Sequence, residues 1–384
     1  MKNTELITYV KSSFETNYKT KPVMVFSPGR INIIGEHTDY NDGFVLPAAI
    51  DMGIVTAIQK SNSSFSVITA LNKNETHHFS LDKIESIPNG GWRNYVLGVI
   101  AEIQNKGRKL DNFNIVFGGN IPGGAGLSSS AALENSVVFG LNELFNLGLS
   151  KKDMIFISQK AEHNYVGVKC GIMDQYASMF GQKDTAILLD CQSLNASIVN
   201  IDLGDYEILL INTNVKHNLS ESAYNNRRSV CEKVASILGI NALRDATEKD
   251  LFSVKDQISE ADYQKALYVI QENKRVLQAS EAIKNNDIQL LGRLLYESHE
   301  GLQHQYKVSC DELDFLVEQT KNIPEILGAR MMGGGFGGCT INLIKKDSKK
   351  VLEKIIGSYQ SKFNIQPSVY YVKISDGTKI LDYE

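Results

Sequence analysis

Residues 120–134 read Asn-Ile-Pro-Gly-Gly-Ala-Gly-Leu-Ser-Ser-Ser-Ala-Ala-Leu-Glu, a glycine-rich loop that runs through three serines into an apolar helix. Gly123, Gly124 and Gly126 lack the Cβ atom that would keep the backbone away from a ligand. The free N–H groups of a helix that begins at residues 128–130 would face the same point, and the helix dipole favours an anion there. This glycine-serine loop (residues 122–130) therefore predicts a phosphate cradle.

The helix is supported by spacing beyond the loop. Apolar residues recur at helical intervals between Ala131 and Phe145, and Gly148 supplies a stop. The loop is not the common nucleotide loop, because no lysine follows its glycines, and it is not the dinucleotide fingerprint, because a serine replaces the third glycine. On spacing alone, two interpretations stay open: a phosphate site, or a capped helix after a flexible turn.

The chain has 384 residues, which is more than one hydrophobic core usually organises, so we expect two domains with a cleft between them. Hydrophobic residues make up 42% of the chain, charged residues 22%, and the net charge is −4. These values are typical of a globular enzyme and do not favour a nucleic-acid-binding protein.

Targeting and redox signals are weak. The first ten residues lack the apolar core of a signal peptide, and no window reaches the roughly 18 apolar residues of a membrane span, so we expect a cytoplasmic protein. The five cysteines are scattered without a C-x-x-C pair and are expected to be reduced. The pair His77-His78 lies in a polar stretch and is interpreted as loop rather than as a metal site.

Periodicity predicts a mixed α+β order of elements rather than a strict alternation of strands and helices. Strands are expected at 22–26, within 45–58, and at 113–117, 186–189, 206–212, 339–344 and 368–374. Helices are expected at 93–105, 129–147, 151–166 and 347–362, and several more between about 220 and 322. We place the domain boundary near residue 205, which gives domains 1–205 and 206–384.

Residues 27–41 carry the densest group of polar side chains, and they follow directly after a predicted strand. Glu36, His37 and Asp39 offer acceptors and a switchable donor, which is the set that vicinal sugar hydroxyls require. A solvated junction between strand and loop is the alternative.

Two further segments are informative. In Cys170-Gly171-Ile172-Met173-Asp174-Gln175 a single carboxylate lies among apolar residues, and pairing with Arg30 would keep it ionised and able to accept a hydroxyl proton. An exposed turn is the alternative. The glycine-rich segment (residues 331–339) formally contains G-x-G-x-x-G, but it leads into a strand and not into a helix. Close backbone packing against a ligand or another loop is the better interpretation.

Taken together, these motifs resemble one family. Residues 29–40 are similar to the galactokinase signature, and the glycine-serine loop and residues 328–339 resemble the second and third motifs of the superfamily of galacto-, homoserine, mevalonate and phosphomevalonate kinases. The glycine-serine loop alone would indicate only the superfamily. Residues 35–40 together with 171–175 are specific to galactokinase-like proteins, and similar motifs follow in order along nearly the whole chain.

The resemblance implies two α+β domains, the first like the second domain of ribosomal protein S5, with the active site between them. It implies ATP-dependent phosphorylation of the C1 hydroxyl of α-D-galactose, which gives α-D-galactose 1-phosphate and ADP. This is the first kinase step of galactose catabolism. Galactose and ATP would be its partners. Separately, we expect a monomer, because the sequence shows no long apolar stripe that would be exposed.

Roles for single residues follow from the resemblance. Asp174 is expected to be the catalytic base and Arg30 its partner. The residues expected to bind the sugar are Glu36, His37, Thr38, Asp39, Gly171 and Tyr224. Those expected to wrap the ATP phosphates are Gly124, Ala125, Gly126, Leu127, Ser128, Ser129 and Ser130. Ser130 and Glu162 are expected to bind Mg²⁺, and Trp92 is expected either near the adenine or in plain core packing.

Two other functions remain alternatives. An N-acetylgalactosamine kinase would need additional room beside the C2 hydroxyl, which a sequence does not reveal. A non-catalytic galactose sensor would keep the fold, but known sensors of this kind lack part of the serine-alanine tract, which is intact here at residues 128–132.

Overall fold

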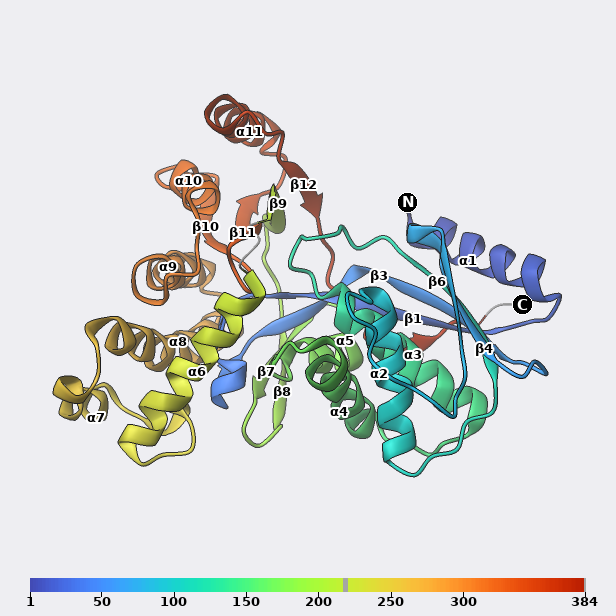
Figure 1. The fold of residues 1–384 in the computed structure, drawn as a ribbon. Coiled ribbons are helices and arrows are strands. Elements are labelled where there is room, and N and C mark those ends of the chain that lie inside the picture. Colours follow the sequence, from blue (N-terminus) through green and yellow to red (C-terminus); the bar gives the residue numbers. More distant parts are fainter. Residues whose placement is uncertain (217–219, 383–384) are drawn as a thin grey trace.

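The computed structural model describes residues 1–216 and 220–382. Two β-sheets organise its two halves, and most of the helices lie around these sheets (Figure 1). The expected α+β class is therefore confirmed. No helix of the described ranges is long and apolar enough to cross a membrane.

The first half contains a six-stranded sheet with the order β13-β1-β3-β6-β4-β5. Its strands are β1 (Val23–Asn32), β3 (Pro47–Lys60), β4 (Ser66–Ala70), β5 (Glu75–Phe79), β6 (Phe113–Gly119) and β13 (Lys379–Ile380). All neighbours are antiparallel except β4 and β6. A register shift between Pro28 and Arg30 marks a bulge in β1 at the start of the polar segment.

The two faces of this sheet are both covered, because apolar residues point alternately to each side of its strands. One face packs against α1 (Asn3–Tyr18) through Leu6, Val10 and Phe14. The other face carries helices that include the one predicted after the glycine-serine loop. These helices are α2 (Trp92–Asn105), α3 (Ser129–Phe145), α4 (Lys151–Ala161) and α5 (Met173–Phe180).

Helix α4 continues into a π-helical turn, η3 (Glu162–Val166), which ends at Gly167. Such turns are rare and occur frequently at functional sites. A small sheet of β2 (Phe44–Val45), β7 (Thr185–Asp190) and β8 (Ala196–Asn200) completes the first half.

The second half is built on an antiparallel sheet with the order β10-β11-β9-β12. Its strands are β9 (Tyr206–Lys216), β10 (Ile326–Met331), β11 (Gly337–Lys345) and β12 (Ser368–Tyr371). Helices α8 (Glu260–Lys284) and α9 (Ile288–Glu300) contribute to the core on one face, and α10 (Asp311–Thr320) and α11 (Lys349–Phe363) cover the other. Helices α6 (Ser220–Leu238) and α7 (Glu248–Ser253) pack against α8.

One apolar core joins the two halves. Ile31, Ile33 and Ile34, at the end of β1 and just beyond it, pack in the same cluster as Leu210 and Ile341 of the second sheet. The β1–β2 loop (residues 33–43) therefore leaves the first sheet and enters the second half.

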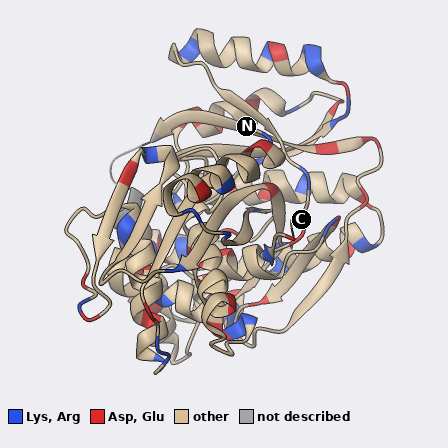
Figure 2. Cartoon of the chain, turned by 90° about the vertical axis from the view of Figure 1, so that its right-hand side faces the viewer, with Lys and Arg blue, Asp and Glu red and all other residues tan. Residues whose placement is uncertain are grey.

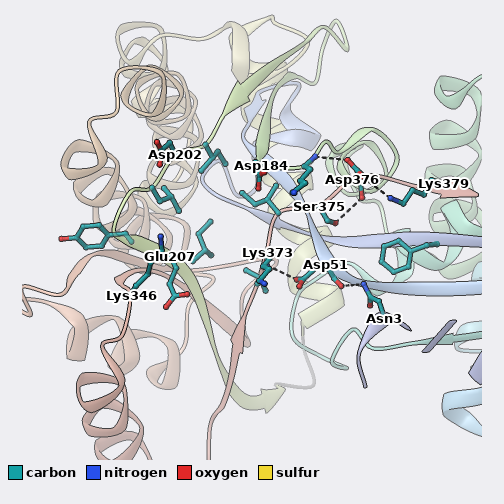
Figure 3. Close-up of a pocket in the computed structure, with 18 of the residues that line it drawn as sticks. Asn3, Asp51, Asp184, Asp202, Glu207, Lys346, Lys373, Ser375, Asp376 and Lys379 are labelled. Carbon is teal, nitrogen blue, oxygen red and sulfur yellow. Dashed lines mark hydrogen bonds and ion pairs between the residues drawn. The ribbon is translucent and has the colours of Figure 1, made fainter. Parts of the chain in front are cut away.

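The C-terminal segment crosses back to the first half. Ile374 bridges to Ile50, and β13 pairs with β1 at the edge of the first sheet. Figure 3 shows the cavity of about 710 Å³ under this crossing, where Asp51 accepts a hydrogen bond from the backbone of Lys373 at 3.0 Å. The boundary near residue 205 stays a prediction, but the second domain as predicted (206–384) includes a final strand that belongs to the first sheet.

Most of the strongly periodic elements lie where the sequence predicted them, whereas α1, α5, β4, β5, β8, β10 and β13 were not predicted. The five unpredicted strands have two to six residues each, which is too short for a clear alternation. All five cysteines are free, as expected. Charges of both signs are scattered over the helices and loops of the side shown in Figure 2.

Candidate active site

A small polar cavity of about 140 Å³ lies where the β1–β2 loop meets the second half. Its lining residues are Arg30, Glu36, His37, Asp39, Glu162, Val168, Cys170, Met173, Asp174, Tyr224, Gly333 and Gly334. The cavity thus brings together residues from three separately predicted motifs. The larger cavity of Figure 3 shares none of these residues and contains none of the predicted site residues.

Arg30 and Asp174 form a bidentate ion pair. Nε of Arg30 donates to Oδ1 of Asp174 at 2.7 Å, and Nη2 donates to Oδ2 at 2.9 Å. The hydroxyl of Ser128 also donates to Oδ2. The side chain of Asp174 keeps 26% of its surface exposed. The ion pair between Arg30 and Asp174, which the sequence left open, is therefore present. Together with Ser128, it places one donor on Oδ1 and two on Oδ2 of Asp174.

The glycine-serine loop presents unpaired backbone donors. Helix α3 has no side-chain cap, and its first backbone bond to the preceding turn is that of Ala132 to the carbonyl of Ser128 at 3.1 Å. Among the described residues, the N–H groups of Ser129, Ser130 and Ala131 have no acceptor. Free N–H groups at the positive end of a helix dipole form a site for an anion.

The loop is fixed from behind. The side chains of Ala125 and Leu127 are buried in the core shared by both halves, so only their backbone can face a nucleotide. Nη1 of Arg30 donates to the carbonyl of Gly126 at 2.6 Å. Arg30 therefore connects the carboxylate of Asp174 to the glycine-serine loop.

A second cavity, of about 400 Å³, adjoins the start of α3. Trp92, Tyr95 and Phe117 line its apolar side, and Ser129 and Ser130 line it next to the loop. Nε1 of Trp92 donates to Glu75 at 2.7 Å, which holds the indole in place. The expectation that Trp92 lies near an adenine stays a prediction that this position supports.

Acidic side chains gather behind Ser130. Burial raises the pKa of Glu162 to about 7, the hydroxyl of Ser130 opposes this shift, and the charge of Asp174 adds to it. Glu134 is fully buried, and both burial and the Glu162 carboxylate raise its pKa well above the usual value. The group therefore carries an excess of negative potential.

Helix α8 of the second half holds the β1–β2 loop at two points and the first residue of β2 at a third. Oε1 of Glu272 accepts from the backbone N–H of Gly35 at 3.0 Å, and the hydroxyl of Tyr268 donates to the carbonyl of Glu36 at 3.0 Å. The amide oxygen of Asn273 accepts from the N–H of Phe44 at 2.8 Å. The predicted sugar-binding side chains are thus presented by a clamped loop.

His37 is held in an unusual conformation. Its φ of 62° is in the left-handed region, and its Nδ1 lies 2.7 Å from the hydroxyl of Tyr40, which in turn lies 2.7 Å from that of Tyr306. Burial lowers the pKa of His37 to about 3, and the charge of Arg227 adds to the effect, so the ring is neutral. Nε2 is buried without a partner among the described residues. A ligand hydroxyl in the cavity would satisfy it.

Asp39 contacts the segment around Asp174. A Cβ atom on Gly171 would lie 2.0 Å from Oδ2 of Asp39, so the absence of a side chain at 171 makes room for this carboxylate. Burial raises the pKa of Asp39 to about 7, and the charge of Asp174 raises it further. Asp39 lines the cavity, whereas Gly171 shapes it from behind.

Thr38 was expected to bind the sugar, but the structure gives its side chain another role. The residue is fully buried, and its hydroxyl lies within hydrogen-bond distance of the carbonyls of Gly35 and Phe44, at 2.9 and 2.7 Å. It closes the β1–β2 loop on itself and is not among the residues that line the cavity. Tyr224, from α6, does line the cavity and lies 5.4 Å from the His37 ring.

Sequence reasoning missed Arg330. This arginine is fully buried in β10 and contacts Glu36. The sequence did contain a sign of a buried ion pair here, because a lone arginine within the apolar stretch from Ile326 to Met332 needs a buried partner. Which partner it takes could not be read locally, since Glu36 lies 294 positions away.

The glycine-rich segment packs against the glycine-serine loop, as expected. A Cβ on Gly333 would lie 3.5 Å from Cα of Gly126, and one on Gly335 would lie 2.1 Å from the carbonyl oxygen of Val308. Both glycines have positive φ, of 85° and 83°. The segment therefore brings the second half into close backbone contact with the loop at the start of α3.

The raised pKa of Asp39 predicts a pH-dependent stability. The folded protein binds a proton at Asp39 that the unfolded chain loses near pH 4, so its free energy of unfolding falls as pH rises to about 7. An amide at position 39 would not titrate, so in Asp39→Asn this fall in the free energy of unfolding should be absent. Measured by denaturant unfolding without ligands, the free energy of unfolding of Asp39→Asn relative to that of the wild type should therefore rise by up to roughly 1.4 kcal/mol per pH unit between about pH 4 and pH 7.

The control for this prediction is Asp111→Asn, at an exposed aspartate of the same half. We expect it to keep a constant difference from the wild type between pH 4 and pH 8. Parallel stability curves for Asp39→Asn and the wild type would contradict the assignment of a buried, protonated Asp39.

Comparison with known protein families gives three matches along the chain. The galactokinase galactose-binding signature matches residues 12–60. The N-terminal domain of GHMP kinases matches residues 94–182, and the C-terminal domain of GHMP kinases matches residues 279–361. The first match includes Arg30 and the β1–β2 loop, and the second includes the glycine-serine loop, Glu162 and Asp174.

Individual relatives agree. A galactokinase of Thermosipho africanus is 46% identical over 93% of this chain and 99% of its own length, and one of Clostridium beijerinckii is 41% identical over 98% and 99%. The crystal structure of Lactococcus lactis galactokinase complexed with galactose superimposes with a TM-score of 0.93 at 34% identity, over 97% of this chain and 99% of that one. A Methanococcus jannaschii mevalonate kinase shares the fold at 18% identity, with a TM-score of 0.66 over 93% of this chain and 100% of its own. The chain therefore belongs to the galactokinase family of the GHMP kinases.

Proposed function

We propose that this sugar kinase transfers the γ-phosphoryl group of ATP to the C1 hydroxyl of α-D-galactose. The observation that carries the proposal is the position of Asp174. Its carboxylate lines the small polar cavity and is linked through Arg30 and Ser128 to the glycine-serine loop. An acceptor hydroxyl in the cavity would therefore lie between a base and a phosphate site. The galactose bound in the related Lactococcus lactis structure supports this choice of sugar.

In this mechanism, positioning and charge neutralisation supply most of the acceleration. Asp174 orients the sugar hydroxyl and accepts its proton late, as the bond to the leaving group breaks. Arg30 holds the Asp174 carboxylate at two points and adds positive charge near the transferred group. The free N–H groups at the start of α3 would bind the phosphates before reaction, so that little reorganisation is needed.

Recognition of the sugar would come from the β1–β2 loop. Glu36 and Asp39 line the cavity with carboxyl groups, and Nε2 of the neutral His37 is buried without a hydrogen-bond partner in the part of the chain that the structure describes. A site built for the axial C4 hydroxyl disfavours glucose, because the epimer leaves buried groups unpaired at roughly 1–3 kcal/mol each.

Mg²⁺ fits the acidic group beside the loop. Glu162 and Ser130 offer hard oxygen ligands, and the raised pKa values of Glu162 and Glu134 indicate excess negative potential that a cation would relieve. In the described part of the chain, no three His, Cys, Asp or Glu side chains form a metal cluster. Phosphate oxygens and water would then complete the shell, and the bound ion would neutralise charge on the phosphates.

The other assignments remain proposals of the same kind: a domain boundary near residue 205, a monomeric state and a cytoplasmic location. The two alternative functions, an N-acetylgalactosamine kinase and a galactose sensor, become outcomes of the first experiment. The intact tract at residues 128–132 and the paired Asp174 and Arg30 favour a catalytic protein over a sensor.

The first experiment measures ADP release with ATP and Mg²⁺ while galactose, N-acetylgalactosamine, glucose and mevalonate are offered separately at equal concentration. We expect turnover with galactose alone. Turnover confined to N-acetylgalactosamine would replace the sugar assignment and leave the fold and phosphate site in place. No turnover with any acceptor would support the sensor.

Replacing the proposed base should separate chemistry from binding. We expect Asp174→Ala to lower kcat by about 10²- to 10⁴-fold, the usual contribution of a general base, while galactose binding by calorimetry changes far less. Asp174→Asn is the isosteric control. Its kcat should fall as well, because an amide cannot accept the proton. A near-normal kcat in either variant would rule out this role.

Replacing the proposed metal ligand should act on the nucleotide. We expect Glu162→Ala to raise the Mg²⁺ and ATP concentrations needed for half-maximal rate, because a hard oxygen ligand is lost, with galactose affinity little changed. Glu143→Ala, at an exposed glutamate of α3, is the control and should behave as the wild type. A loss confined to galactose affinity would show that Glu162 is wrongly placed.

A further inference from the structure

Arg330 reaches from β10 in the second half to the β1–β2 loop in the first. Its side chain is fully buried, as is nearly all of the Glu36 side chain. Nη1 and Nη2 each donate to Oε1 of Glu36 at 3.1 Å. The remaining donors bind backbone carbonyls: Nε binds that of Ile33 at 2.9 Å, Nη1 that of Met331 at 2.6 Å, and Nη2 that of Asn32.

These contacts use the whole donor capacity of the guanidinium. Arginine has five N–H groups in a fixed planar fork, and five hydrogen bonds are present. A lysine has three rotating donors on a point charge and could not make the same set. The site at β10 is therefore built for arginine rather than for positive charge alone.

The effect on Glu36 is asymmetric. Oε1 accepts both bonds from Arg330 and a third from the backbone N–H of Gly333 at 2.9 Å. Among the described residues, Oε2 has no hydrogen-bond partner, and Glu36 lines the small polar cavity. One carboxylate oxygen is fixed by the second half while the other remains available to a ligand.

We propose that Arg330 is a positioning residue for sugar specificity: it fixes the carboxylate of Glu36 so that Oε2 meets one hydroxyl of galactose. This inference rests on the proposed galactose site. Arg330 does not line the cavity, so it acts through Glu36 and not by contact with the sugar. It also supplies the positive charge that allows Glu36 to be buried near Asp39 and Asp174.

A purely structural role would be different. Arg330 also ties β10 to the end of β1 through the carbonyls of Asn32 and Ile33, and loss of these bonds alone would weaken the fold and affect both substrates. The positioning role predicts instead a selective loss at the sugar site. Separate measurements for galactose and for ATP distinguish the two.

The test is Arg330→Lys in the full-length chain. We expect the KM for galactose and its calorimetric Kd to rise at least about tenfold, and the preference for galactose over glucose to fall, while the KM for ATP stays within about twofold; a tenfold change is about 1.4 kcal/mol. The matched control is Arg293→Lys, the same substitution at an exposed arginine of α9 in the same half and outside the cavity. It should leave galactose affinity unchanged.

Arg330→Lys with wild-type galactose affinity and selectivity would overturn the inference, as would equal losses for galactose and ATP. The proposed function fails separately, if the wild-type protein itself neither binds nor phosphorylates galactose. If Arg330→Lys does not fold, galactose binding is compared between Glu36→Gln and the double variant Glu36→Gln/Arg330→Met. The double variant leaves no buried charge without a partner, and it differs from Glu36→Gln only in lacking the arginine that holds residue 36. Weaker galactose binding in the double variant would support the inference, and equal binding would overturn it.

Discussion

Two buried arginines make this site possible. Glu36, Asp39, Glu162 and Asp174 line one small cavity, and burial alone would drive these carboxyl groups toward their neutral forms. Arg30 pairs with Asp174 and Arg330 with Glu36, so each arginine holds one carboxylate in a fixed orientation. Within the described ranges Asp39 and Glu162 have no arginine ion pair of this kind, and burial raises their pKa values to about 7. The division gives ion-paired, oriented carboxylates to the proposed base and to one side of the proposed sugar site, and leaves beside Glu162 the excess negative potential that the proposed cation would relieve.

Much of this arrangement could be predicted from the sequence, but only where the signal was local. Helical spacing predicted a helix at 129–147, and α3 spans Ser129–Phe145. The pairing of Arg30 with Asp174 was conditional, because no local pattern shows that residues 144 positions apart meet. Arg330 and the return of β13 to the first sheet were missed for the same reason: each depends on a partner that only the folded chain supplies. Thr38 shows the opposite limit: it was assigned to the sugar from its place within a motif, and its local spacing did not reveal that its hydroxyl lies within hydrogen-bond distance of the carbonyls of Gly35 and Phe44.

The site also holds backbone conformations that cost free energy. His37 has a φ of 62° and Ser128 a φ of 56°, both in the left-handed region that residues other than glycine rarely adopt. Each lies at a point where a side chain turns toward the site: His37 lines the small polar cavity, and the Ser128 hydroxyl donates to Asp174. Surrounding contacts hold them, since Tyr40 and Tyr306 fix His37 and the buried Ala125 and Leu127 fix the loop before α3. The left-handed conformations of His37 and Ser128 thus cost free energy at two residues of the candidate site, and the packing around them offsets that cost.

The close approach of the two glycine-bearing segments explains why the site needs both halves of the chain. Gly126 and Gly333 lie backbone to backbone, and each is also bonded to one of the two key pairs. The carbonyl of Gly126 accepts from Arg30, which holds Asp174, and the N–H of Gly333 donates to Glu36, which Arg330 holds. A continuous series of contacts therefore runs from Asp174, the proposed base, past the glycine-serine loop, to Glu36, which the proposal places against the sugar. Because phosphoryl transfer depends on alignment of the acceptor oxygen with the phosphate, this connection would let binding of the sugar determine the geometry of the proposed reaction.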